Sequence, residues 1–132
     1  MFKCEEIRKD LPRAKKFFEN ILSFTVGSFT LEDMIKNKLD AVNIADVRNY
    51  EDYIEGHIPY AVHLPYADIE KHINMLDKSK ITIVYTYNNS CIKAYEAALL
   101  MLDNKYPSAV LRGGFHAWKK HGLEIVKNSA EE

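Results

Sequence analysis

The segment from Tyr85 to Cys91 has the layout of a loop that binds a small anion. An apolar strand predicted over residues 80–86 runs into a polar loop, after which a helix is predicted to extend to about Asp103. The N–H groups at the start of a helix lack partners within it, and the helix dipole places partial positive charge there. Asparagines also tolerate the left-handed backbone that tight loops often need. We therefore predict that the anion-binding loop consists of Tyr87, Asn88, Asn89 and Ser90.

Cys91 carries the thiol nearest to this loop. At the first turn of the predicted helix the dipole favours a nucleophilic thiolate, and Lys93 adds positive charge. Cys91 also shares a helical face with Ala94 and Ala98, the predicted core face, and free cysteines are among the most buried residue types. We favour the structural interpretation and keep the catalytic one as the alternative.

Three further residues follow the predicted strand Ser108–Leu111. Arg112 is the nearest cation for an anionic ligand, and Gly113 and Gly114 permit close approach of the backbone. The histidines show no metal-ligand spacing with carboxylates or cysteines, so the sequence predicts neither a metal site nor a cofactor.

Composition narrows the class of protein. The 132 residues are 47% hydrophobic and 28% charged, as in soluble globular domains, and the net charge of −1 gives no argument for a nucleic-acid partner. No apolar run approaches the ~20 residues that cross a bilayer, so we expect no membrane segment. Two cysteines are too few for a disulfide scaffold and predict free thiols in the reducing cytoplasm.

Alternating strands and helices must position the loop. Strands are predicted over residues 41–46, 80–86 and 108–111, and helices over 91–103 and 115–120; a capping box at Thr30 predicts one over 30–37. This order predicts an α/β fold with a mostly parallel sheet and helices on both faces. Ligands of such folds bind beyond the carboxyl ends of the strands, here after Asp46, Tyr85 and Leu111.

An amphipathic helix is predicted at Leu11–Leu22, with Asp10 as its N-cap and apolar residues in one stripe. We therefore divide the chain into an N-terminal helical extension, residues 1–23, and one domain, residues 24–132. The apolar stripe requires a cover. It docks either on its own domain, the interpretation we favour, or on a second copy in a homodimer.

The chain resembles the rhodanese-like family over about residues 24–126. The resemblance rests on Asp46-Val47-Arg48, Gly56-His57-Ile58-Pro59, the strand Ile83-Val84-Tyr85, and Arg112-Gly113-Gly114 followed by Trp118 and Gly122. It implies a three-layer α/β/α domain and, in active members, sulfur transfer through a cysteine persulfide at the first residue of the loop.

The resemblance implies that Thr86 stands at the nucleophile position and Cys91 at the position that closes the loop, where active members often have Arg. A threonine hydroxyl forms no persulfide and is far less acidic than a thiol, so we expect Thr86 to be inert. Some members of the family carry a second cysteine at the end of the loop, and this chain resembles them except at Thr86.

The remaining motif residues are expected to support the pocket. Asp46 and Arg48 would form a charged pair, joined by Glu51 or Glu55, and His57 would be a hydrogen-bonding turn residue. The family commonly has glycine where Tyr60 stands, so either the backbone there is ordinary or the aromatic ring reshapes one wall of the pocket.

Three functions are consistent with the sequence. The first, which we favour, is a module without ordinary thiosulfate sulfurtransferase activity that binds a small anion or a protein through the loop. The second is a sulfurtransferase or persulfide carrier that uses Cys91 and a sulfur donor. The third is an assembly domain whose N-terminal helix is the functional surface.

Overall fold

A five-stranded, entirely parallel sheet is the centre of the molecule. The structure is a computed structural model that describes residues 4–88 and 90–128, so the predicted role of Asn89 lies outside the described residues. The strands are β1 (Thr25–Val26), β2 (Val42–Asp46), β3 (Ala61–His63), β4 (Ile81–Tyr85) and β5 (Ser108–Leu111), in the spatial order β1-β5-β4-β2-β3. Asp46 pairs in register with Tyr85 on one side and with His63 on the other, so the carboxyl ends of three strands meet at one edge.

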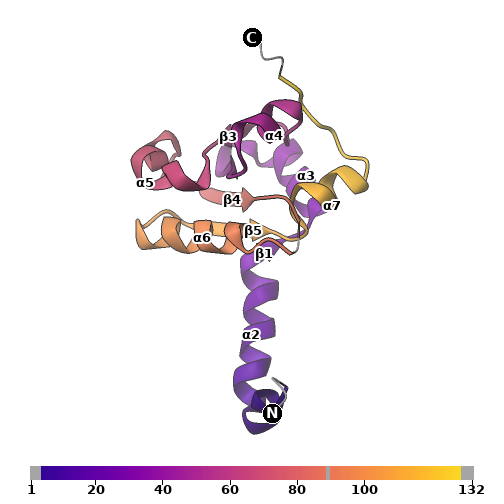
Figure 1. Ribbon diagram of the computed structural model, residues 1–132, viewed down its shortest axis with the longest axis vertical. Coiled ribbons are helices and arrows are strands. Elements are labelled where there is room, and N and C mark those ends of the chain that lie inside the picture. The colour runs from indigo at the N-terminus through magenta and orange to yellow at the C-terminus, as the bar shows by residue number, and fades with distance from the viewer. Residues whose placement is uncertain (1–3, 89, 129–132) are drawn as a thin grey trace.

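Helices cover both faces of this sheet (Figure 1). The α-helices are α1 (Glu5–Lys9), α2 (Leu11–Phe24), α3 (Ser28–Asn37), α4 (Tyr50–Glu55), α5 (Ile69–His72), α6 (Lys93–Asp103) and α7 (Gly114–Lys120), and short 3-10 helices are η1 (Leu39–Ala41), η2 (Tyr66–Asp68) and η3 (Ile73–Met75). The predicted three-layer α/β/α fold with a parallel sheet is confirmed. None of the helices in the described part of the chain is long and apolar enough to cross a membrane.

Two apolar cores lie on the two faces of the sheet. One core joins α5 and α6 to the sheet through residues such as Ile69, Val84 and Met101. The other joins α3 and α7 to the opposite face through Leu31 and Trp118, both of which are buried. Because both faces are covered, β2 and β4 are mostly apolar, as parallel strands usually are; their polar residues are Asn43, Asp46 and Thr82.

Helix boundaries correct three details of the sequence analysis. α3 begins at Ser28 behind Gly27, so Thr30 is not its N-cap and the capping box predicted there is wrong. α6 begins at Lys93, two residues after Cys91. The segment 90–92 is a turn, in which the Cys91 N–H donates to the Asn88 carbonyl oxygen (3.3 Å) instead of starting the helix.

The N-terminal helix α2 leaves the domain (Figure 1). Asp10 caps it by accepting from the Arg13 N–H (3.1 Å), as predicted. None of the residues of α2, all of which the structure describes, is buried, and its main contacts with its own domain are at β1 and β5. The favoured expectation that the stripe docks on its own domain is therefore wrong for most of the helix.

Candidate functional site

The loop that begins at Thr86 lies at the carboxyl edge of the sheet, directly after the central strand β4. The Thr86 side chain is buried, and its Oγ1 lies 3.8 Å from Cys91 Sγ. Cys91 is half-buried, so it is neither a core residue nor freely exposed. The two residues that the sequence assigned to the start and the end of the loop therefore face each other.

Asn88 organises the loop between these two residues. Its Oδ1 accepts from the Ser90 N–H (2.8 Å), and its carbonyl oxygen accepts from the Cys91 N–H (3.3 Å). This is the side-chain-to-backbone turn that Asn favours. Two of the N–H groups expected to hold an anion thus donate to Asn88 in this conformation.

The Gly113-Gly114 pair fixes the loop from the side of α7. Gly113 has φ +80° and Gly114 φ +57°, a conformation that other residues rarely adopt. A Cβ on Gly114 would lie 2.6 Å from the Thr86 carbonyl oxygen, so only glycine allows this approach. The N–H groups of Phe115 and His116 then donate to the carbonyl oxygens of Thr86 and Tyr87, each at 2.8 Å.

A pocket of about 480 Å³ opens beside the loop. Its lining includes Asn88 and Ser90 from the loop and the side chains of His116, Lys120 and His121 around α7. We did not predict His116 and Lys120 as site residues, although their i, i+4 spacing after the glycine pair places them on one helix face. Arg112, which we did predict as the cation, lies outside the lining and donates from Nη1 to Thr25 Oγ1 (3.0 Å).

Lys93 also differs from its expected role. Its Nζ lies 4.4 Å from the centre of the Tyr66 ring, in a cation–π contact on the α5 side of the domain. The positive charge that borders the loop pocket therefore comes from Lys120 of α7 rather than from α6.

A buried ion pair between Asp46 and Arg48 lies next to the loop. Arg48 Nη2 lies 2.8 Å from Asp46 Oδ2, with both side chains almost completely buried. Arg48 Nη2 also donates to the Gly56 carbonyl oxygen (2.6 Å), which takes the place that we predicted for Glu51 or Glu55. Burial opposes the charge of Arg48, but the hydrogen bonds and the negative charge of Asp46 outweigh it and raise the guanidinium pKa.

Tyr85 completes this buried network. Its hydroxyl donates to Asp46 Oδ2 (2.6 Å) and accepts from the Ile58 N–H (3.1 Å). Burial, followed by the charge of Asp46, raises the pKa of Tyr85 well above its ordinary value. Tyr85 is therefore a neutral donor that holds the carboxylate in place.

Aromatic contacts connect the network to the loop. The Arg48 guanidinium lies 4.1 Å from the centre of the Phe115 ring and 5.8 Å from that of Tyr87. The Phe115 backbone is the one that donates to Thr86, so the ion pair fixes a direct neighbour of the loop. Tyr87 is also tied down, since its hydroxyl donates to Asp52 Oδ2 (2.5 Å); burial, and then this bond, raise the pKa of Tyr87.

His57 is a buried turn residue. Its Nδ1 donates to the Tyr53 carbonyl oxygen (2.9 Å), its ring stacks on that of Tyr53, and its backbone pairs with Val126. Nearby Tyr60 has φ +69° and is exposed, so the alternative of an ordinary backbone there is wrong. His57 acts through the scaffold and does not line the loop pocket.

The site holds no obvious metal centre. Within residues 4–88 and 90–128, no group of three or more His, Cys, Asp or Glu side chains is placed to hold a metal ion.

Comparison with known proteins identifies the fold and the family. Residues 30–121 match the model of the rhodanese-like domain. Curated relatives are the thiosulfate sulfurtransferase GlpE of Coxiella burnetii, 35% identical over 59% of this chain and 72% of that protein, and a sulfurtransferase of Allochromatium vinosum, 30% identical over 76% and 92%. The crystal structure of BH2092 from Bacillus halodurans superimposes with a TM-score of 0.80 at 28% identity, covering 89% of this chain and 87% of that one. The chain belongs to the rhodanese-like domain family.

Proposed function

We propose that this rhodanese-like domain lacks ordinary thiosulfate sulfurtransferase activity and binds a small anion at the loop that begins with Thr86. The observation that carries the proposal is the residue type at this position. Thr86 directly follows β4 and is buried at the base of the loop, and the resemblance to the family assigns it to the position of the cysteine in active members. Relatives named as sulfurtransferases support the family activity but do not extend it to this chain.

The chemistry of thiosulfate explains why the residue matters. In sulfur transfer a thiolate attacks the outer sulfur of thiosulfate, a new S–S bond forms, the old S–S bond breaks and sulfite leaves with its electron pair. A threonine hydroxyl stays protonated at neutral pH and is a poor nucleophile without a general base. Among residues 4–88 and 90–128, the only side-chain partner of Thr86 is Cys91 Sγ, at 3.8 Å, and a thiol is no base for this hydroxyl.

The pocket beside the loop supports anion binding. His116 and Lys120 supply donors from one face of α7, while Ser90 supplies a hydroxyl from the opposite wall. Charge-assisted hydrogen bonds of this kind are the stronger ones in proteins. Movement of Asn88 would release the Ser90 and Cys91 N–H groups towards the same ligand.

A direct binding test uses two neighbouring lysines. Isothermal titration with thiosulfate and with sulfite should show binding to the native chain that Lys120→Met weakens by ~10-fold or more, equivalent to losing one charge-assisted hydrogen bond. Lys119→Met is the matched control because Lys119 is exposed on the same helix and lies outside the pocket lining. Equal affinities of the two variants would contradict the proposed site.

One observation favours persulfide transfer by Cys91 as the second candidate function. The half-buried sulfur of Cys91 lies 3.8 Å from Thr86 Oγ1, so it sits across the loop from the position where active members carry their cysteine. A Cys91 thiolate attacking thiosulfate would release sulfite and leave a persulfide beside the same pocket. The sulfur donor would then bind where we place the anion.

Intact mass after incubation with thiosulfate separates the two functions. We expect the native chain and Cys91→Ala to gain no sulfur, and Thr86→Cys to gain one sulfur atom that a reductant removes. A sulfur gained by the native chain and absent from Cys91→Ala would overturn the proposal and assign the persulfide to Cys91. Failure of Thr86→Cys to gain sulfur would show that the loop no longer supports the chemistry at this position.

A further inference from the structure

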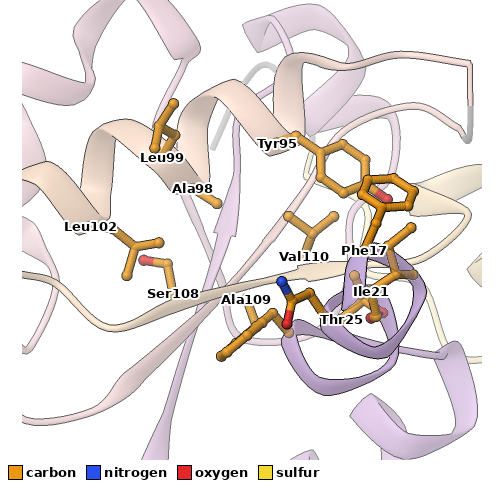
Figure 2. A pocket seen from close by; sticks show the side chains of 12 residues that line it. Phe17, Ile21, Thr25, Tyr95, Ala98, Leu99, Leu102, Ser108, Ala109 and Val110 are labelled. Carbon is orange, nitrogen blue, oxygen red and sulfur yellow. The ribbon is translucent and has the colours of Figure 1, made fainter. Parts of the chain in front are cut away.

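An apolar surface that the loop site does not use runs along α2 and α6. A groove of about 570 Å³ separates the two helices, and Figure 2 shows Tyr95 of α6 and Phe17 of α2 on the two sides of it, near Val110 of β5. Phe17 and Ile21 form the α2 wall, Tyr95, Leu99 and Leu102 line the α6 side, and Val110 lies on the floor. Nearly all of the exposed surface in the groove is apolar.

The same surface continues outside the groove as a ridge. Leu11, Phe18 and Leu22 of α2 expose 64%, 58% and 72% of their surface. These residues belong to the apolar stripe of the helix, while Phe17 and Ile21 from the same helix line the groove. One helix therefore provides a ridge on one side and the wall of a groove on the other, which is the self-complementary shape that a two-fold interface requires.

We propose that this surface binds a second copy of the chain, with α2 of each protomer lying in the groove between α2 and α6 of its partner. Two-fold symmetry places the two α2 helices side by side and brings α6 of each protomer against α2 of the other. The functional loop of each protomer stays outside this contact, because none of the pocket residues beside the loop lines the groove.

The available area matches a stable dimer. Phe17, Phe18, Leu22, Phe24, Tyr95, Leu99 and Leu102 expose between 45% and 72% of their surface. At roughly 100 Å² for each half-exposed large side chain, with Leu11 and Ile7 at the end of the stripe, the surface offers on the order of 900 Å². A standard interface buries about 800 Å² on each partner.

A stable α2 also requires a partner that packs against its apolar stripe. An isolated helix of 14 residues is marginal in water, and α2 has no buried residue in the single chain. A second copy covers the stripe along its whole length, whereas the domain of the same chain reaches only the end near β1.

A membrane surface is the competing occupant, because Arg13, Lys15 and Lys16 lie on the polar side of α2. The groove argues against it. Leu99 and Leu102 belong to the helix on the far side of the groove, and a flat bilayer in contact with the ridge would leave them uncovered.

Sedimentation velocity of the full chain at micromolar concentrations tests the proposal. The native protein should sediment as a species with twice the 15.3 kDa mass of one chain. Leu22→Glu on the ridge and Leu99→Glu in the groove should each raise the dissociation constant by ~100-fold or more, because each would place an unpaired charge in an apolar contact. Met75→Glu is the matched control, since Met75 is an equally exposed apolar residue on η3 and should leave the dimer intact.

A cooperative urea transition, which reports the two cores of the domain and not α2, would show that the variants are folded. A native chain that is monomeric at every concentration would overturn the proposal, as would a dimer that both glutamate variants leave unchanged. Co-sedimentation with phosphatidylglycerol–phosphatidylcholine vesicles tests whether the surface binds a membrane instead. A monomeric chain that binds these vesicles, and loses the binding with Leu22→Glu, would assign the surface to a membrane instead.

Discussion

At the scale of single residues, the molecule depends on a charged pair that is completely removed from solvent. Arg48 Nη2 donates to Asp46 Oδ2 and to the Gly56 carbonyl oxygen, and the Tyr85 hydroxyl donates to the same carboxylate oxygen of Asp46. Such a pair stabilises little in total, but removing one partner leaves an uncompensated buried charge. The contacts of Arg48 with Phe115 and Tyr87 make this pair part of the loop's support.

Arg48→Met should lower the free energy of unfolding by ~3–5 kcal/mol, since Asp46 would stay buried without its partner. Urea denaturation measures this change. Arg8→Met is the control, because the 3.9 Å contact between Arg8 and Glu5 is exposed and such pairs contribute at most ~1 kcal/mol. Equal losses in the two variants would contradict the role given to the buried pair.

The raised pKa of Tyr85 predicts that the free energy of unfolding depends on pH in the alkaline range. Its pKa is raised in the folded chain, so the folded state retains a proton that the unfolded state releases above pH ~10. The contribution of Tyr85 to the free energy of unfolding is therefore complete below pH ~10. As the pH rises above ~10 this contribution is lost, at about 1.4 kcal/mol per pH unit for this one group.

Chemical denaturation at a series of pH values checks this expectation. The free energy of unfolding of Tyr85→Phe should be lower than that of the native chain at neutral pH, because the hydrogen bond to Asp46 is lost. Above pH ~10 the variant should lose stability less steeply than the native chain. Parallel curves at alkaline pH would show that Tyr85 titrates equally in both states.

At the scale of elements, the contact between the loop and the start of α7 sets the geometry of the site. The loop and the glycine pair are far apart in the sequence, but β4 and β5 are adjacent strands and deliver both to one edge of the sheet. The N–H groups of Phe115 and His116 then hold the loop carbonyls, and residues of the loop and of α7 line the pocket together.

Gly114→Ala should lower the free energy of unfolding by ~3 kcal/mol or more, because the φ of +57° is strained for alanine and the new methyl group would collide with the Thr86 carbonyl. Gly122→Ala is a matched control with φ +74° and no atom within 4 Å, and it should cost only ~1–2 kcal/mol. Faster hydrogen exchange of the Phe115 amide in Gly114→Ala alone would place the damage at the loop.

At the scale of the whole molecule, the chain consists of a covered sheet and a helix that leaves it (Figure 1). The two cores belong entirely to residues after Phe24. The division at residue 23 that the sequence suggested therefore remains a prediction about independent folding, and the helical extension contributes its exposed surface rather than core packing.

A chain that begins at Phe24 should unfold cooperatively and lose no more than ~2 kcal/mol, a small part of the roughly 5–15 kcal/mol of a typical domain. Thermal and urea denaturation at low protein concentration measure this without a contribution from association. A truncated chain without a cooperative transition would show that α2 is an integral part of the domain.

The sequence by itself determined the fold and the order of its parts. Apolar runs, the glycine pair and the motif around Asp46 and Arg48 specified strands, a turn and the family, because periodicity and turn chemistry are local properties of the chain. The pairing of Asp46 with Arg48 was also predictable, since the two residues are adjacent in the motif.

Only the tertiary structure decided which groups surround the loop. Cys91 was predicted on a helix and lies before it, facing Thr86, while Arg112 turns to Thr25 and leaves the pocket to His116 and Lys120. The prediction that the apolar stripe of α2 docks on its own domain was wrong for the same reason. A stripe of apolar residues specifies that a helix needs a partner, but the partner is chosen by packing between segments distant in the sequence, which no local pattern records.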